Sequence, residues 1–122
     1  MYEVIFYKTD SGNEPFDKLV HGLLKEHKTV ELAGIWLYID NLKKYGREIN
    51  KFVPGSIKHL KNKLWELRPQ KSRILFFYFD KRNCFVILHG FIKKTQKTPK
   101  KEIERGEQEI KNIEGRQWDE GI

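Results

Sequence analysis

The sequence contains one cysteine and no long apolar run, and each shortage excludes a class of protein. Cys84 is the only cysteine, which excludes an intramolecular disulfide and fits a reducing cytosol. It has no cysteine or histidine partner at metal-ligand spacing, so we expect a small core residue there and no bound metal or cofactor. No apolar run reaches the roughly 18 residues of a membrane span, and no signal peptide is visible. We therefore expect a cytoplasmic protein with no membrane partner.

Acidic residues are scarce in one part of the chain. Residues 51–101 carry 14 Lys and Arg but only Glu66 and Asp80, whereas residues 1–50 and 102–122 are each slightly acidic, and the net charge is +7. A basic block of this kind produces a local positive field that attracts polyanions. It favours contact with nucleic acid. The alternative is a lysine-rich surface that serves solubility.

The sequence is rich in aromatic residues, with eight Phe, five Tyr and three Trp among 122 residues. Disordered chains are poor in aromatics, so this composition predicts a folded protein. The length suits one domain that buries about two-thirds of its unfolded surface. We expect this domain to span residues 1–114, followed by a flexible tail at 115–122.

Apolar periodicity and turn residues predict an α+β fold of order β-α-α-β-β-β-α. The expected elements are a strand at 2–8, helices at 14–27 and 29–45, strands at 63–68, 73–80 and 84–93, and a helix at 99–114. Asn13 and Thr98 are expected to cap helices, and Ser56 to Lys61 to form one helical turn. The first two helices should form a hairpin, with a buried stripe that includes Trp36, packed on a mostly antiparallel sheet. Near-continuous apolar residues in the last two strands indicate central strands covered on both faces.

Strand direction predicts that cations meet at one end of this sheet. Short connections make the last three strands antiparallel, so Arg68 should lie beside Arg73, and Lys93 and Lys94 should return to the same edge. The final helix begins just beyond, and its N-terminus also attracts anions. Three of these cations have a simpler explanation: Arg68 could pair with Glu66, and the two lysines could guard a hydrophobic strand against aggregation.

This group of cations could cleave RNA without a metal. The 2′-OH can attack its own phosphate if arginine and lysine position it in line and offset the charge that develops. The general base stays open among Glu66, His59 and Lys93, and His89 is expected to be a core histidine. Further RNA-binding candidates are the neighbouring lysines Lys58, Lys61, Lys63, Lys71, Lys97, Lys100 and Lys101.

Several motifs resemble the RelE/ParE superfamily of bacterial toxins, in its HigB-like, phage-derived branch. They are Ile57-Lys58-His59-Leu60, Leu64-Trp65-Glu66-Leu67-Arg68-Pro69, Arg73-Ile74-Leu75-Phe76 and the long run from His89 to Ile103 (HGFIKKTQKTPKKEI). The resemblance implies a RelE-like microbial RNase fold. It also implies a type II toxin that enters the ribosomal A site and cleaves mRNA, a metal-independent endoribonuclease.

The resemblance also implies partners and roles. A HigA-like helix-turn-helix antitoxin would neutralise the toxin, and operator DNA would be bound only through that antitoxin. Arg73 would stabilise the transition-state phosphate, Lys93 or Lys94 would match the cation that ends the fourth strand, and Arg68 would be a further basic group. Two alternatives remain open: a ParE-type poison of DNA gyrase, and a non-catalytic module that binds RNA or the antitoxin.

Overall fold

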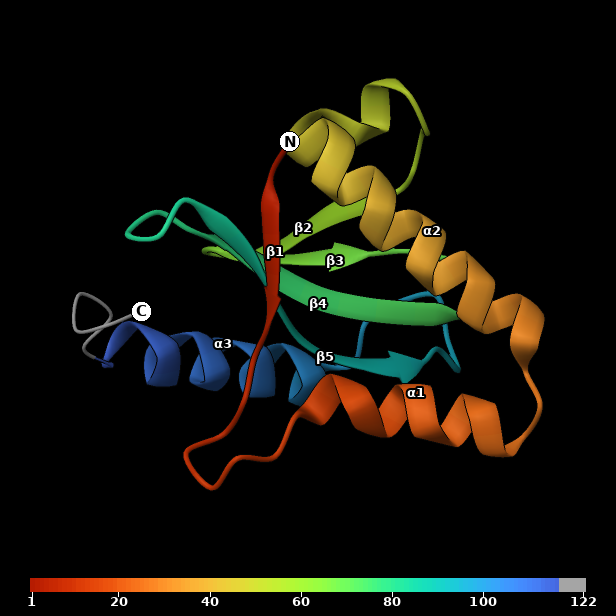
Figure 1. Cartoon of the computed structure of the whole chain (residues 1–122), viewed down its shortest axis with the longest axis horizontal. Coiled ribbons are helices and arrows are strands. Elements are labelled where there is room, and N and C mark those ends of the chain that lie inside the picture. Colours follow the sequence, from red (N-terminus) through yellow and green to blue (C-terminus); the bar gives the residue numbers. More distant parts are fainter. Residues whose placement is uncertain (117–122) are drawn as a thin grey trace.

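A five-stranded sheet forms the centre of the computed structural model, which describes residues 1–116 (Figure 1). The strands lie in the order β1-β5-β4-β3-β2, with β1 parallel to β5 and every other pair antiparallel. The elements are β1 (Glu3–Phe6), α1 (Pro15–Lys25), α2 (Thr29–Tyr45), the 3₁₀ helix η1 (Gly46–Lys51), β2 (Ile57–Lys61), β3 (Leu64–Leu67), β4 (Ser72–Phe79), β5 (Cys84–Ile92) and α3 (Lys100–Glu114). This architecture confirms the predicted α+β class and the mostly antiparallel sheet.

The sheet separates two hydrophobic cores. The α1–α2 hairpin covers one face, where Phe16, Ile35 and Ile39 pack with Phe76 and the other apolar residues of that face. The second core lies under α3 and includes Ile110 and Ile113 together with the buried Cys84. Alternate residues of β4 belong to the two cores, because successive side chains of a strand point to opposite faces. Hence β4 and β5 are the covered central strands that the sequence predicts.

A β-bulge changes this alternation in β5. The register of β4 with β5 shifts between Leu75 and Phe76, so that Leu75 pairs with His89 and Phe76 with Ile87. Leu88 packs in the core under α3, and the extra residue also turns His89 toward α3. The bulge thus places a polar side chain beneath the last helix.

Four local predictions are wrong. Residues 57–61 form the edge strand β2, not a helical turn. The residue before α1 is Glu14 and the one before α3 is Pro99, and neither helix has a side-chain cap, since Asn13 and Thr98 bond elsewhere. Trp36 is 42% exposed at the rim of the hairpin, where it meets the rings of Phe6 and Phe16 edge-on.

The end of α3 lies against the loop that follows β1. Gly115 ends the helix, and the Arg116 guanidinium donates to the Lys8 carbonyl at 2.6 Å and lies over the Tyr7 ring. The rest of the predicted tail, residues 117–122, lies outside the described residues. Within residues 1–116, no helix is long and apolar enough to cross a membrane.

Candidate active site

One edge of the sheet brings together the ends of β3, β4 and β5, as strand direction predicts, and also the start of β2, which was not predicted to be a strand. Leu67 pairs with Ile74, which makes Arg68 and Arg73 neighbours at the next position. The Arg68 N–H bonds the Ser56 carbonyl at 2.7 Å, which adds the start of β2. The Lys93 N–H bonds the Lys71 carbonyl at 2.8 Å, which adds the end of β5. We call this edge, with Arg68, Lys71, Arg73, Lys93 and Lys94, the basic edge.

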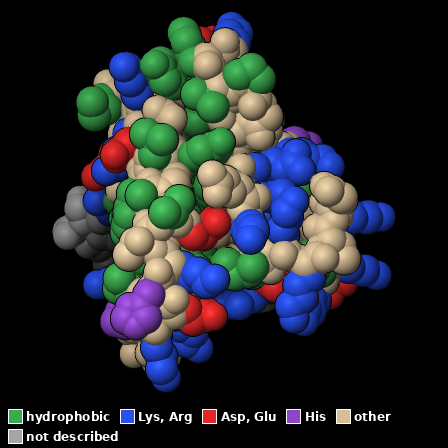
Figure 2. All heavy atoms as spheres, turned by 90° about the vertical axis from the view of Figure 1, so that its right-hand side faces the viewer, with side chains coloured by type: hydrophobic (Ala, Val, Ile, Leu, Met, Phe, Trp, Pro, Cys, Tyr) green, Lys and Arg blue, Asp and Glu red, His purple; other side chains and the backbone are tan. Residues whose placement is uncertain are grey.

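A space-filling view shows that positive side chains are concentrated at the basic edge (Figure 2). The β5 arrow points toward the basic edge in Figure 1, and Figure 2 views the molecule from that side. Lys and Arg gather over one half of this view, whereas hydrophobic side chains dominate the other half (Figure 2). Lys71 and Lys94 are exposed and Lys93 is half-buried. A positive surface of this kind concentrates anions near the strand ends.

Arg73 is the most buried cation of the basic edge, with 5% of its surface exposed. Its Nη1 donates to the carbonyl of Ser72, the first residue of β4, at 2.8 Å and to that of Gln70, in the turn before β4, at 3.1 Å. Burial lowers the pKa of the Arg73 guanidinium, and the neighbouring Arg68 lowers it further. The guanidinium remains charged at neutral pH, because the usual pKa of an arginine lies far above 7. Arg73 is therefore a fixed, poorly solvated cation, which interacts strongly with an anion.

Glu66 is almost fully buried beside the two arginines, at 1% exposure. It alternates with Leu67 on β3, so it shares the α3 face with Arg68. One carboxylate oxygen accepts a bond from the Thr98 hydroxyl, and the other lies 3.5 Å from Arg68 Nε. The carboxylate thus orients Arg68 and anchors the loop before α3. The simple pairing of Arg68 with Glu66 that the sequence allowed is present in the structure.

The structure divides the six other lysines that were predicted to bind RNA between the two ends of the sheet. Lys58 is exposed and pairs across the strands with Glu66. Lys97 is exposed in the loop before α3, and Lys100 and Lys101 are exposed at the start of that helix. Lys61 and Lys63 lie at the other end of the sheet, where they pair with carboxylates of α3. Lys61 Nζ is 3.5 Å from Glu107, and Lys63 Nζ donates to Glu114 at 2.6 Å, which raises the pKa of Lys63.

His59 is not brought together with the arginines. It pairs with Trp65 on the face of the sheet away from Glu66, and the two rings are 5.1 Å apart. Its Nε2 lies 2.6 Å from the Asn62 carbonyl. His59 and Trp65 line a pocket at the other end of the sheet.

A buried polar cluster under α3 was not predicted. His89, 1% exposed, bonds Glu109 through Nδ1 at 2.6 Å and Glu102 through Nε2 at 3.1 Å. Arg105 Nε lies 3.4 Å from the second Glu109 oxygen. A signal existed in the sequence, because Glu102 and Glu109 are seven residues apart and share the helix face that carries Gly106 and Ile113. His89 is thus a satisfied core histidine, as predicted, and it links α3 to β5.

Metal ligands are not grouped in the described part of the chain. No cluster of three or more His, Cys, Asp or Glu side chains among residues 1–116 could hold a metal ion. Burial also raises the pKa of the Cys84 thiol, which keeps it protonated and inert in the core. The chemistry available at the basic edge is therefore that of fixed arginines, lysines and one buried carboxylate.

The element order and the mixed sheet are consistent with a RelE-like fold. Comparison with family models matches residues 22–111 to the family of phage-derived Gp49-like proteins (DUF891). The match covers most of the chain, including all five residues of the basic edge, so the chain belongs to this family, which is associated with RelE/ParE-like toxins. A comparison with curated proteins gives no significant match.

Proposed function

We propose that this protein is the toxin of a type II toxin–antitoxin pair that cleaves mRNA on the ribosome. A buried arginine, Arg73, fixed beside Arg68 and Glu66 on a basic edge, is the observation that carries the proposal. Membership of a family associated with RelE/ParE-like toxins supports it. A HigA-like helix-turn-helix antitoxin is the proposed partner, the ribosomal A site the place of action and the cytoplasm the compartment.

Cleavage needs no metal in this mechanism. The 2′-oxygen forms a bond to the adjacent phosphorus as a general base takes its proton. The bond from phosphorus to the 5′-oxygen breaks, its electron pair goes to that oxygen, and the oxygen takes a proton from the protonated base or from water, which leaves a 2′,3′-cyclic phosphate and a 5′-hydroxyl. Arg73 stabilises the charge that builds on the phosphate oxygens, because a fixed and poorly solvated cation does not have to reorganise during the reaction. Arg68, oriented by Glu66, holds the same phosphate in line.

The geometry favours Lys93 among the three candidate bases. Both oxygens of Glu66 are engaged, one by Thr98 and one by Arg68, and His59 faces the other side of the sheet. Lys93 lies at the basic edge itself. A Lys93→Arg variant keeps the charge but has no usable basic form. We expect RNA binding close to wild type and cleavage slowed by about 10²-fold or more, measured in single-turnover reactions on programmed ribosomes. Undiminished cleavage would remove Lys93 from this role.

The test of the function is expression of Arg73→Ala, with primer extension on a translated mRNA. We expect wild type to arrest growth and produce cuts within codons, and the variant to lose both, by at least about 10²-fold in cleavage. Lys81→Ala is the matched control, because Lys81 is an exposed cation in the turn at the opposite end of β4.

Three results would contradict the proposal in different ways. Cleavage that survives Arg73→Ala would remove the phosphate-stabilising role. Inhibited gyrase with intact mRNA would favour the ParE-type poison. RNA or antitoxin binding by the wild type, without cleavage or toxicity, would favour a non-catalytic binding module.

A further inference from the structure

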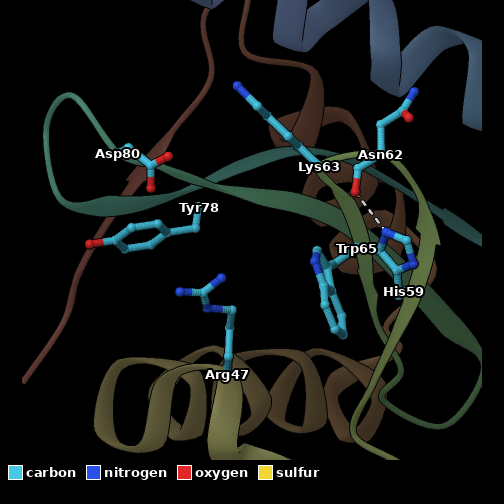
Figure 3. A pocket seen from close by; sticks show the side chains of 7 residues that line it. All are labelled: Arg47, His59, Asn62, Lys63, Trp65, Tyr78 and Asp80. Atoms are coloured by element: carbon cyan, nitrogen blue, oxygen red, sulfur yellow. Dashed lines mark hydrogen bonds between the residues drawn. The ribbon is translucent and has the colours of Figure 1, made fainter.

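An open pocket of about 470 Å³ lies at the end of the sheet away from the basic edge (Figure 3). Its lining comes from η1, from the β2–β3 hairpin and from the end of β4: Arg47, His59, Asn62, Lys63, Trp65, Tyr78 and Asp80. We call it the aromatic pocket. Its volume falls in the range of about 300–1,000 Å³ that is typical of small-molecule sites.

The aromatic pocket combines flat rings with the exposed guanidinium of Arg47. Tyr78 and Trp65 stand on opposite sides of it, and Arg47 rises between them from η1 (Figure 3). The Arg47 guanidinium lies 5.1 Å from the centre of the Tyr78 ring, and the His59 ring lies 5.1 Å from Trp65. Rings and guanidinium planes of this kind are the surfaces on which proteins stack unpaired nucleobases.

Polar groups around the rings complete the match to a nucleotide. Asp80 supplies carboxylate oxygens that can accept bonds from the amino group or ring N–H of a base, and exposed Arg47 supplies a charge for a phosphate. Lys63 contributes mainly its stem, because its ammonium group is bound to Glu114. The pocket therefore suits a flat, hydrogen-bonding ring attached to one anionic group.

The pocket is also placed where an RNA strand could reach it from the basic edge. β2 is the outermost strand of the sheet, and its consecutive residues Lys58 and His59 face opposite sides. Lys58 lies across from Glu66 at the proposed active site, whereas His59 lies across from Trp65 in the pocket. An RNA single strand that passes over the unpaired side of β2 would contact both Lys58 and His59.

We propose that the aromatic pocket binds an unpaired nucleobase of the RNA, at a subsite separate from the cleavage site. That the base comes from RNA rests on the proposed function. The stacking surface is a feature of the structure that does not depend on that function. This subsite would add affinity, and base preference, to the phosphate contacts of the basic edge.

The experiment titrates the ¹⁵N-labelled full-length chain with nucleoside 5′-monophosphates and follows the indole N–H signals of its three tryptophans. A Trp65→Phe variant assigns the relevant signal. We expect AMP or UMP to shift the Trp65 signal saturably. Arg47→Ala and His59→Ala, both at exposed residues, should weaken this binding by at least about fivefold, and Lys81→Ala should leave it unchanged.

Ribose 5-phosphate separates stacking from capture of the phosphate alone. An equal shift with ribose 5-phosphate, or no shift of Trp65 with any nucleotide, would overturn the proposal. Arg73→Ala distinguishes this failure from that of the proposed function. The Arg73→Ala variant should bind nucleotides like wild type and lose mRNA cleavage. If the wild type cleaves mRNA but its Trp65 signal does not respond to nucleotides, only the pocket proposal is refuted. Nucleotide binding in a wild type that cleaves no mRNA refutes only the function.

Discussion

Burial distinguishes two arginines that the sequence presents as equals. Arg73 is almost fully enclosed and bonded to the carbonyls of Gln70 and Ser72, whereas the Arg68 side chain is 28% exposed and pairs with Glu66. In the proposed mechanism, the enclosed arginine stabilises charge and the more exposed one meets and holds the phosphate. These two proposed roles depend on the surroundings of each side chain, so residue type alone could not suggest them.

The lowered pKa at this position predicts a pH-sensitive Arg73→Lys variant. Burial and the nearby Arg68 both favour the neutral form of a base, so the pKa of a lysine ammonium placed there should also fall below its usual value. The ammonium would lose its proton as pH rises, and with it the charge that we propose stabilises the phosphate. We expect the ratio of variant to wild-type cleavage to decline between about pH 7 and pH 10. A ratio independent of pH would contradict this account of the site.

At the scale of elements, the end of α2 depends on a glycine. Gly46 has a φ of 60° and donates its N–H to the Leu42 carbonyl, which closes the last turn. A Cβ built there would lie 2.6 Å from the Tyr2 ring. The sequence correctly predicts the stop, but the contact with Tyr2 joins residues too distant for local reasoning to find.

This geometry predicts that Gly46→Ala destabilises the protein. The backbone strain and the clash with Tyr2 together should lower the free energy of unfolding by about 1–3 kcal/mol. Urea denaturation followed by circular dichroism measures the change. Gly12→Ala is a useful comparison, because Gly12 also has a positive φ but open space around its Cα. A smaller loss at Gly12 than at Gly46 would isolate the contribution of the clash.

β2 shows why some elements escape sequence analysis. Ile57 and Leu60 are three residues apart, which suits a helical turn, yet they pack in different cores on the two faces of the sheet. Apolar residues at an odd spacing also occur in a strand that has apolar residues on both faces. The bulge between His59 and Lys61 further hides the alternation. Local pattern therefore could not decide between the two structures.

The sequence predicts those parts of the candidate site that follow from the order and direction of the strands. Antiparallel order alone places Arg68, Arg73 and Lys93 at one edge. The bond from Thr98 to Glu66, the face taken by His59 and the enclosure of His89 by two glutamates join residues from different elements. Contacts of that kind follow from packing in three dimensions, which no sequence window contains.

At the scale of the whole molecule, charge is distributed unequally between the two ends of the sheet. The basic edge carries cations that carboxylates only partly offset, whereas Lys61 and Lys63 at the other end are paired with α3. Long-range attraction of a polyanion should therefore be directed to the basic edge. The net charge of +7 alone would not distinguish this arrangement from a uniform one.

The asymmetry predicts how salt affects RNA binding. Removing both Lys93 and Lys94 by mutation to Ala should reduce the slope of log Kd against log salt for a short single strand by about 1.4, since each phosphate contact contributes about 0.7. The pair Lys61→Ala and Lys81→Ala removes the same charge from the other end and should leave the slope nearly unchanged. Fluorescence anisotropy at several salt concentrations gives both slopes. Equal losses would indicate a diffuse positive surface.

The parallel pairing of β1 with β5 has a consequence for how the chain folds. Glu3 lies beside Cys84, so the first strand to be synthesised takes its partner from near the end of the sequence. The β2–β5 meander closes only short loops, whereas β1 must wait for a long closure that costs more entropy. The N-terminal strand, which carries Tyr2 toward Gly46, should therefore dock late. Amides of β1 should gain protection from hydrogen exchange after those of β4 during refolding.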